Sequence, residues 1–257
     1  MATESVLMSR QAPASSAISE EEWQTRVDLA ACYRLIALYD MDDLFATHIS
    51  ARVPESDEHF LLNPYGLLFE QVTASNLVKV DLGGNIVQDT EYAINPAGFV
   101  IHSAVHAARP DVACVIHTHT VAGIAVASTQ AGLLPITHKA VRFYNRVGYH
   151  DYEGRALELD ERARLARDLG KHNALILRNH GLLTCGATVE RAFFTMVDLE
   201  KSCKVQVAAM SMGAKLIELS RNLAEHAAGQ FDRRTDDGGG WPALLTMLDR
   251  IDPSYRT

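Results

Sequence analysis

Apolar residues between positions 20 and 38 recur at the three- and four-residue spacing of a helix with one buried side. This buried stripe consists of Val27, Ala31, Leu35 and Leu38. Ser19 stands three residues before Glu22, which is typical of a helix N-terminus, and an acidic turn at residues 40–43 marks the end. The pattern therefore predicts a packing helix that begins at Ser19 and ends near residue 40.

The pattern then changes to short segments rich in β-branched residues. Three segments predict strands: THISARV (47–53), HFLLN (59–63) and LVKVDLGGNIV (77–87). The third contains the pair Gly83-Gly84, which is typical of a hairpin turn. We therefore expect a sheet in this part of the chain.

Helices and strands alternate in the remaining sequence. Helices are predicted at 99–108, where Arg109-Pro110 stops the helix, at 121–128, at 160–169 and from Thr188 to about Met212. Strands are predicted where DVACVIHTHT (111–120) reaches its histidines and where ALILRNHGLL (174–183) ends at His180-Gly181. Residues 129–158 show neither helical nor strand periodicity of apolar residues and are expected to be irregular.

Mixed strands and helices in this order favour an α/β sandwich in one domain. We expect a flexible N-terminal segment at 1–18, where Ser, Ala and Pro are frequent, and a folded domain at 19–228. Residues 229–257 are interpreted as a C-terminal tail that contains the polar hinge DRRTDDGGG at 232–240.

Composition narrows the class of protein. A chain of 257 residues with 47% apolar residues can bury a large core without disulfides. The net charge of -8, without a basic block, argues against nucleic acid as a partner. No long apolar run predicts a membrane span or a signal peptide. The four cysteines form no CxxC pair, which favours a reducing, cytoplasmic location.

Candidate chemistry begins with the two histidines of the segment DVACVIHTHTVAG. Residues i and i+2 of a strand face the same side, so the imidazoles of His117 and His119 converge. Such a pair is also found as surface or packing histidines, and a metal would need a third ligand. His180 is our candidate, because it ends another apolar strand and Gly181 allows a sharp turn there. Imidazole nitrogens suit zinc, iron or manganese.

A second pair, His102 and His106, lies four residues apart on one face of a predicted helix. The spacing resembles that of zinc proteases, but the sequence HSAVH lacks the glutamate that follows the first histidine in HExxH. We therefore expect hydrogen bonding or helix packing from this pair rather than metal ligation.

Acid-base groups are sought in the irregular segment THKAVRFYNRVGYHDYEG (137–154). Arg142 could pair with a substrate carboxylate, and Tyr149 or His150 could move a proton, with His138 as a further candidate. Tyr144 and Tyr152 stand in the same segment. Loop packing or a subunit interface is the alternative role. A long segment with few signals also suits ordering by a neighbouring subunit.

Three stretches together resemble the class II aldolase/adducin family, and specifically its adducin-like bacterial branch. They are HFLLNPYGLLFEQVTASNLVKVDLGGNIV, NPAGFVIHSAVHAARPDVACVIHTHT and LILRNHGLL, and the resemblance covers roughly residues 20–225. It implies a three-layer α/β/α sandwich with a mostly antiparallel central sheet. It also implies a homotetramer with sites near subunit interfaces.

The resemblance further implies that His117, His119 and His180 bind one divalent metal, usually zinc, which polarises a carbonyl and stabilises an enediolate. Where the aldolases carry a metal-site glutamate, this chain has Gly98. The aldolases bind phosphate through a Gly-Asn sequence near the start of the domain. This chain has ATHIS at that place (46–50), so a phosphorylated substrate is not expected. Three neutral ligands leave the metal charge uncompensated, which favours a small anionic substrate. We expect the missing side chain at Gly98 to leave room for a substrate oxygen.

The preferred function is a metal-dependent lyase that catalyses aldol cleavage, decarboxylation or dehydration of a small oxyanion-bearing metabolite. A mononuclear non-haem Fe(II) oxygenase is the first alternative, because three histidines leave positions open for substrate and dioxygen. A non-catalytic binding module is the second, since adducin is a cytoskeletal protein that shares the glycine at the position of Gly98.

Overall fold

The computed structural model describes residues 18–233 and 240–257. Seven strands are His48–Arg52 (β1), His59–Leu62 (β2), Val78–Asp81 (β3), Cys114–Thr118 (β4), Gly148–His150 (β5), Ala174–Leu177 (β6) and Gly181–Gly186 (β7). Seven α-helices are Glu20–Leu38 (α1), Pro96–Ala108 (α2), Val121–Ala127 (α3), Glu161–Leu169 (α4), Val189–Ser211 (α5), Arg221–Asp232 (α6) and Gly240–Ile251 (α7). Short 3₁₀ helices span Phe69–Gln71, Ala140–Phe143 and Pro253–Arg256.

The strands form one sheet in the order β3-β2-β1-β4-β7-β6-β5. Every neighbouring pair is antiparallel except β5 and β6, which are parallel. The mostly antiparallel sheet that the family resemblance implied is therefore confirmed. Its central strands β1, β4 and β7 bring His48, His117 and the start of β7 side by side.

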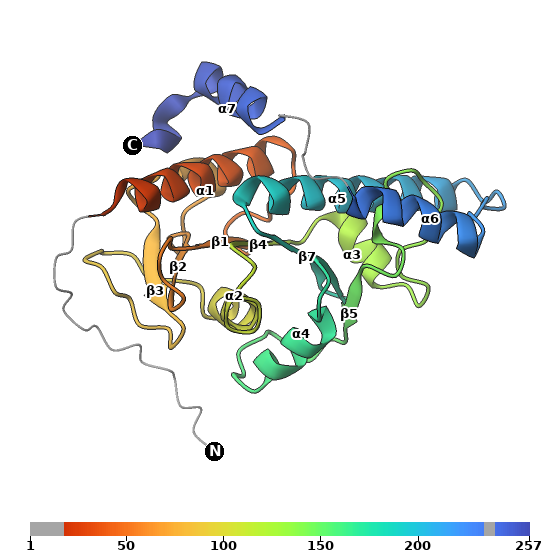
Figure 1. The fold of residues 1–257 in the computed structure, drawn as a ribbon, viewed down its shortest axis with the longest axis horizontal. Helices are drawn as coiled ribbons and strands as arrows, with labels where there is room; N and C mark the ends of the chain where they lie inside the picture. The colour runs from red at the N-terminus through yellow and green to blue at the C-terminus, as the bar shows by residue number, and fades with distance from the viewer. Residues whose placement is uncertain (1–17, 234–239) are drawn as a thin grey trace.

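Helices cover both faces of the sheet, and each strand sends alternate side chains to the two sides. Ile116 of β4 belongs to the core shared with α1 and α5, whereas Val115 belongs to the core shared with α2 and α4. Figure 1 shows α1 and α5 above the sheet and α2 and α4 below it. This is the predicted three-layer α/β/α sandwich, and His117 faces the α2 side as Val115 does.

Helix α2 begins earlier than the sequence pattern predicted. Pro96 occupies its first turn, and the Asn95 side chain accepts hydrogen bonds from the backbone N–H groups of Ala97 and Gly98. Proline has no N–H to lose at this position, and its φ already suits a helix. Gly98 therefore lies within the first turn of helix α2.

Two other predictions near the site were wrong. The segment ALILRNHGLL is two strands, β6 and β7, because Asn179 adopts a left-handed conformation with φ of 57° and turns the chain between them. His180 lies in that turn. The segment 129–158 contains the short strand β5 and a 3₁₀ helix, since backbone pairing with β6 supplies order that side-chain periodicity does not signal.

The C-terminal region forms helices that the sequence analysis did not predict. The expected domain boundary at residue 228 lies inside α6, and α7 buries Trp241 and Leu248 in the core it shares with α1. Of the predicted flexible segment 1–18, only Ile18 is among the described residues. Residues 234–239 of the expected hinge also lie outside the described residues. Among the described helices, none combines the length and apolar character needed to cross a membrane.

Candidate metal centre

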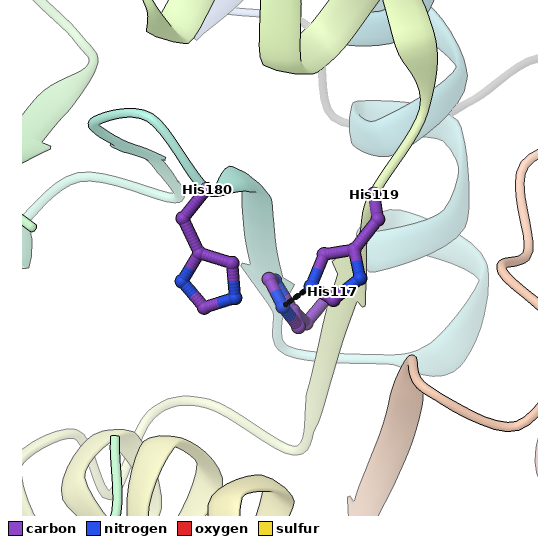
Figure 2. A group of neighbouring side chains, drawn as sticks. All are labelled: His117, His119 and His180. Atoms are coloured by element: carbon purple, nitrogen blue, oxygen red, sulfur yellow. Dashed lines mark hydrogen bonds between the residues drawn. The ribbon is translucent and has the colours of Figure 1, made fainter. Parts of the chain in front are cut away.

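Three histidines converge where β4 ends and β7 begins. Because β4 and β7 are antiparallel, Thr118 lies opposite Leu182, and the turn before β7 carries His180 to the end of β4. A Cβ on Gly181 would lie 2.3 Å from the Thr118 carbonyl oxygen, so only glycine allows this approach. One ring nitrogen from each of His117, His119 and His180 lies within 4.8 Å of the others. Figure 2 shows the three rings gathered around one point.

Hydrogen bonds orient two of the three rings. His117 Nδ1 is 3.0 Å from the Leu182 carbonyl oxygen, to which it donates, and His119 Nδ1 donates to Asp43 Oδ2 at 3.0 Å. A neutral imidazole carries one N–H, so both Nε2 atoms keep a lone pair. These two Nε2 atoms lie 2.8 Å apart. Lone pairs at that distance repel unless a cation or a proton lies between them.

Burial keeps His117 and His180 in their neutral form. Desolvation lowers the pKa of His117 well below its usual value, and neighbouring histidines lower it further. Burial, together with His119 and His150, lowers the pKa of His180 to about 4. Neutral imidazole is the ligating form of histidine. The donor set, its tautomers and its charge thus fit a divalent metal ion, with no carboxylate in the cluster.

The second histidine pair takes part in a buried network next to this cluster. His102 Nε2 is 2.8 Å from His48 Nδ1, and His102 Nδ1 is 2.5 Å from Ser50 Oγ. His106 Nε2 lies 2.7 Å from the same hydroxyl. The His48 ring in turn lies 4.9 Å from the ring of His117, measured between centroids. The expected hydrogen-bonding role of His102 and His106 agrees with these contacts.

His48, like Asp43, is a site residue that the sequence analysis missed. It stands on β1 directly opposite His117 and is 2% exposed. The signal was present in THISARV, where His48 and Ser50 alternate with apolar residues on a strand that is buried on both faces. Polar side chains on such a strand require buried partners, which the three layers supply.

His48 also overturns our expectation for Gly98. A Cβ on Gly98 would lie 2.8 Å from His48 Cδ2 and 2.9 Å from its Cγ. The space beside residue 98 is therefore filled by the His48 ring and is not free for a substrate oxygen. The His48 ring, on β1, therefore occupies the space into which a side chain at position 98 of α2 would project.

The loop residues proposed for acid-base work are dispersed. Arg142 forms an ion pair with Asp198 at 2.8 Å, in a pocket whose lining contains none of the three histidines. His138 packs its ring 5.3 Å from Phe231. The structure therefore does not bring Arg142 or His138 into the cluster.

Tyr149 and His150 both lie on β5 but have different surroundings. The Tyr149 hydroxyl accepts a hydrogen bond from Leu133 N, and its ring lies under the Arg178 guanidinium. His150 is buried, with Nδ1 2.8 Å from Asp168 Oδ2, and it lines the same small cavity as His180. Tyr152, which is 57% exposed, has its ring 6.3 Å from that of His180.

Comparison with known proteins places these features in a family. Residues 27–207 match the class II aldolase and adducin N-terminal domain. A protein of Pseudomonas aeruginosa named for the class 2 aldolases is 53% identical over 93% of this chain and 94% of its own length. Alpha-adducin of Rattus norvegicus is 40% identical over 95% of this chain, which spans only 35% of that protein.

Solved structures of class II aldolase proteins are also similar to this chain. The crystal structure of an aldolase II superfamily protein from Pseudomonas syringae is similar with a TM-score of 0.89 and 50% identity, covering 93% of this chain and 98% of that one. An L-fuculose 1-phosphate aldolase from Glaciozyma antarctica is similar with a TM-score of 0.81 and 29% identity, covering 96% and 97% of the two chains.

Proposed function

On the premise that the chain belongs to the class II aldolase and adducin family, we propose that it is a divalent-metal-dependent lyase. Its substrate is a small oxyanion-bearing metabolite, and the reaction is aldol cleavage, decarboxylation or dehydration. The observation that supports this most is the cluster of three imidazoles with one ring nitrogen each within 4.8 Å of the others, in which the Nε2 atoms of His117 and His119 lie 2.8 Å apart.

His117, His119 and His180 would hold the metal, with zinc as the preferred ion and Fe(II) or Mn as alternatives. When bound, the ion supplies a Lewis acid for negative charge that develops on a substrate oxygen. Asp43 fixes the His119 ring through its Nδ1. Because no carboxylate belongs to the cluster, its ligands leave the full ionic charge in place, and this favours an anionic substrate.

Proton transfer is assigned to the side of the cluster formed by β5 and the residues after it. His150 and Tyr152 line one small cavity with His180, and the Tyr152 ring is accessible. The contacts of Arg142 and His138 with α5 and α6 favour a packing role for those two residues. Tyr149, whose hydroxyl is engaged by Leu133 N, is assigned to support of the loop.

The test is elemental analysis of protein purified without added metal or metal-affinity columns. We expect one equivalent of a divalent metal in the wild-type protein and none in His119→Ala, with the same circular dichroism spectrum. The exposed histidine variant His226→Ala is the matched control and should keep its metal. Full metal content in His119→Ala would contradict the assignment.

Two measurements separate the alternatives. Oxygen consumption by protein loaded anaerobically with Fe(II) would favour the non-haem iron oxygenase. The 40% identity to alpha-adducin supports the other alternative, a non-catalytic binding module. A wild-type protein that binds neither a divalent metal nor small carboxylates would favour that module and exclude the lyase.

We further propose a cytoplasmic homotetramer. All four cysteines are buried and unpaired, which suits a reducing compartment. Val121, two residues after His119, is apolar and 87% exposed, which suits a subunit contact beside the site. The proposed partners are thus copies of this chain and a small anionic substrate, with neither nucleic acid nor membrane.

A further inference from the structure

The two threonines of the sequence HTHT (117–120) contact α5, on the side of the sheet opposite to the metal-site histidines. Side chains alternate along β4, so Thr118 faces the α5 side and His117 faces the other. The Thr118 hydroxyl lies 3.4 Å from the Met196 sulfur, and the Thr120 hydroxyl donates a hydrogen bond to the Glu200 carboxylate. Met196 and Glu200 are four residues apart on one face of α5, so consecutive turns of that helix contact both threonines.

His119 needs such support because it lies beyond the end of β4. The pairing of β4 with β1 ends at His117, and its pairing with β7 ends at Thr118. The His119 ring is bonded to Asp43, whose side chain is 50% exposed. The residue that follows, Thr120, is only 6% exposed, so its contacts are shielded from water. The backbone on this side of His119 is therefore held by Thr120 and not by the sheet.

Glu200 is a buried carboxylate with few partners. It is 2% exposed, and its Oε2 accepts the hydrogen bond from the Thr120 hydroxyl. Its Oε1 has no hydrogen-bond partner among the described residues, and Lys204 Nζ approaches it to 3.4 Å. Burying a charge that is incompletely paired costs folding free energy, because water would solvate it better. Stability alone is therefore a poor explanation for this carboxylate, whereas its bond to Thr120 has a consequence for the site.

The Thr120 hydroxyl also fixes the start of α3. It accepts a hydrogen bond from Gly123 N at 3.1 Å and so caps the helix. A Cβ on Gly123 would lie 2.8 Å from Leu182 Cδ1, so α3 packs closely on β7. The Leu182 carbonyl is in turn the acceptor for His117 Nδ1. One hydroxyl thus ties the end of β4 to α5 and to α3 at once.

We propose that Thr120 and Glu200 are positioning residues of the metal centre. They hold the backbone beyond β4 so that the His119 ring stays facing the rings of His117 and His180. Both act through His119, because neither belongs to the cluster of ring nitrogens. The inference rests on the proposed metal function and deepens it, since it assigns a role to residues on the opposite face of the sheet.

Metal affinity and the stability of the metal-free protein separate positioning from packing. Competition with a coloured chelator gives the affinity for Co²⁺, and urea unfolding gives the stability. Glu200→Leu removes the carboxylate and keeps most of the bulk of the side chain. We expect its Co²⁺ affinity to fall by about tenfold or more, as for other residues that orient a metal ligand. Its urea midpoint should stay near the wild-type value, because an apolar side chain replaces a buried charge.

Thr120→Val should lower the affinity to a similar extent, whereas Thr120→Ser, which keeps the hydroxyl, should stay within about threefold of the wild type. Because the two residues act through one hydrogen bond, Glu200→Leu combined with Thr120→Val should lose little more than either single variant. Asp198→Leu is the matched control. It also removes a buried carboxylate from α5, but one that pairs with Arg142, and it should keep the wild-type affinity.

Wild-type affinity in Glu200→Leu and Thr120→Val would overturn this inference and leave the proposed function intact. An equal loss of affinity in Asp198→Leu, or a lower urea midpoint with unchanged affinity in Glu200→Leu, would show that the pair only packs the fold. Failure of the wild-type protein to bind Co²⁺ would overturn the proposed function and this inference with it. If circular dichroism shows that Glu200→Leu does not fold, the difference in affinity between Thr120→Val and Thr120→Ser decides the question.

Discussion

The ring of His48 occupies the space that a side chain at Gly98 would need. A Cβ there would approach His48 Cδ2 to 2.8 Å, closer than real side chains approach one another. The two residues come from β1 and α2, fifty positions apart, and a larger residue at position 98 would need the His48 ring to move. The absence of a side chain at residue 98 is therefore a packing requirement of this sandwich.

Gly98→Ala is expected to destabilise the protein by up to about 2 kcal/mol, because overpacking costs roughly 1–3 kcal/mol and alanine offsets roughly 1 kcal/mol of this through its helix propensity. Combining it with His48→Ala should cost less than the sum of the two single changes. Gly229→Ala in α6 is the control, since its nearest contact would be 3.6 Å away. Urea unfolding measures all four variants, and strictly additive losses would show that the two residues do not compete for space.

Asp43→Asn should weaken metal binding by about tenfold, because a neutral amide orients the His119 ring less strongly than a carboxylate. Loss of a residue that orients a metal ligand typically weakens metal binding by about 10- to 100-fold. We expect the lower value here because the Asp43 side chain is 50% exposed. Competition with a coloured chelator gives the affinity. Asp42→Asn, next in the chain, serves as control, and equal affinities for the two variants would remove Asp43 from the site.

Val121 is exposed in the single chain and is proposed to lie in a subunit interface. Val121→Asp is expected to dissociate the proposed tetramer, because the interface would then bury an unpaired charge. Asp is favourable in the first turn of a helix, so α3 itself should be unharmed. Light scattering at micromolar concentration measures the mass, with Val121→Thr as the uncharged control of the same shape. An Asp variant of unchanged mass would place the interface elsewhere.

Acid should destabilise the metal-free protein through His106. Burial, assisted by the charge of Arg52, lowers the pKa of His106 from 6.5 to about 3. Between these values the unfolded chain binds the proton and the folded chain does not, so the free energy of unfolding falls as the pH drops below 6.5. The loss is roughly 1.4 kcal/mol at one pH unit below 6.5.

Urea unfolding at about pH 7.5 and 5.5 measures this loss. The loss between the two pH values should be smaller by about that amount in His106→Gln than in the wild-type protein. The exposed-histidine variant His226→Gln should behave as the wild type does. An equal loss in His106→Gln and the wild type would mean that His106 is not held neutral by the fold.

The sequence by itself determined the elements whose signals are local. The apolar stripe of residues 20–38 and the long segment after Thr188 predicted α1 and α5, because helix periodicity and capping act within a few residues. The spacing of His117 and His119 predicted two converging imidazoles for the same reason. The end of an apolar strand before Gly181 made His180 a candidate for the third ligand, and the family resemblance then supplied the three-layer fold and the same three histidines as the metal site.

Only the tertiary structure decided which groups surround that cluster. His48 reaches it through the pairing of β1 with β4, and Asp43 reaches it from a turn 76 positions before His119. The turn at Asn179 and the short strand β5 depend on backbone conformation and pairing, which side-chain periodicity does not encode. The ion-pair partners of Arg142 and His150 could not be predicted either, because the type of a residue in a loop does not reveal which distant carboxylate it contacts. Contacts between residues far apart in sequence are set by how the layers pack, and that packing placed His48 beside Gly98.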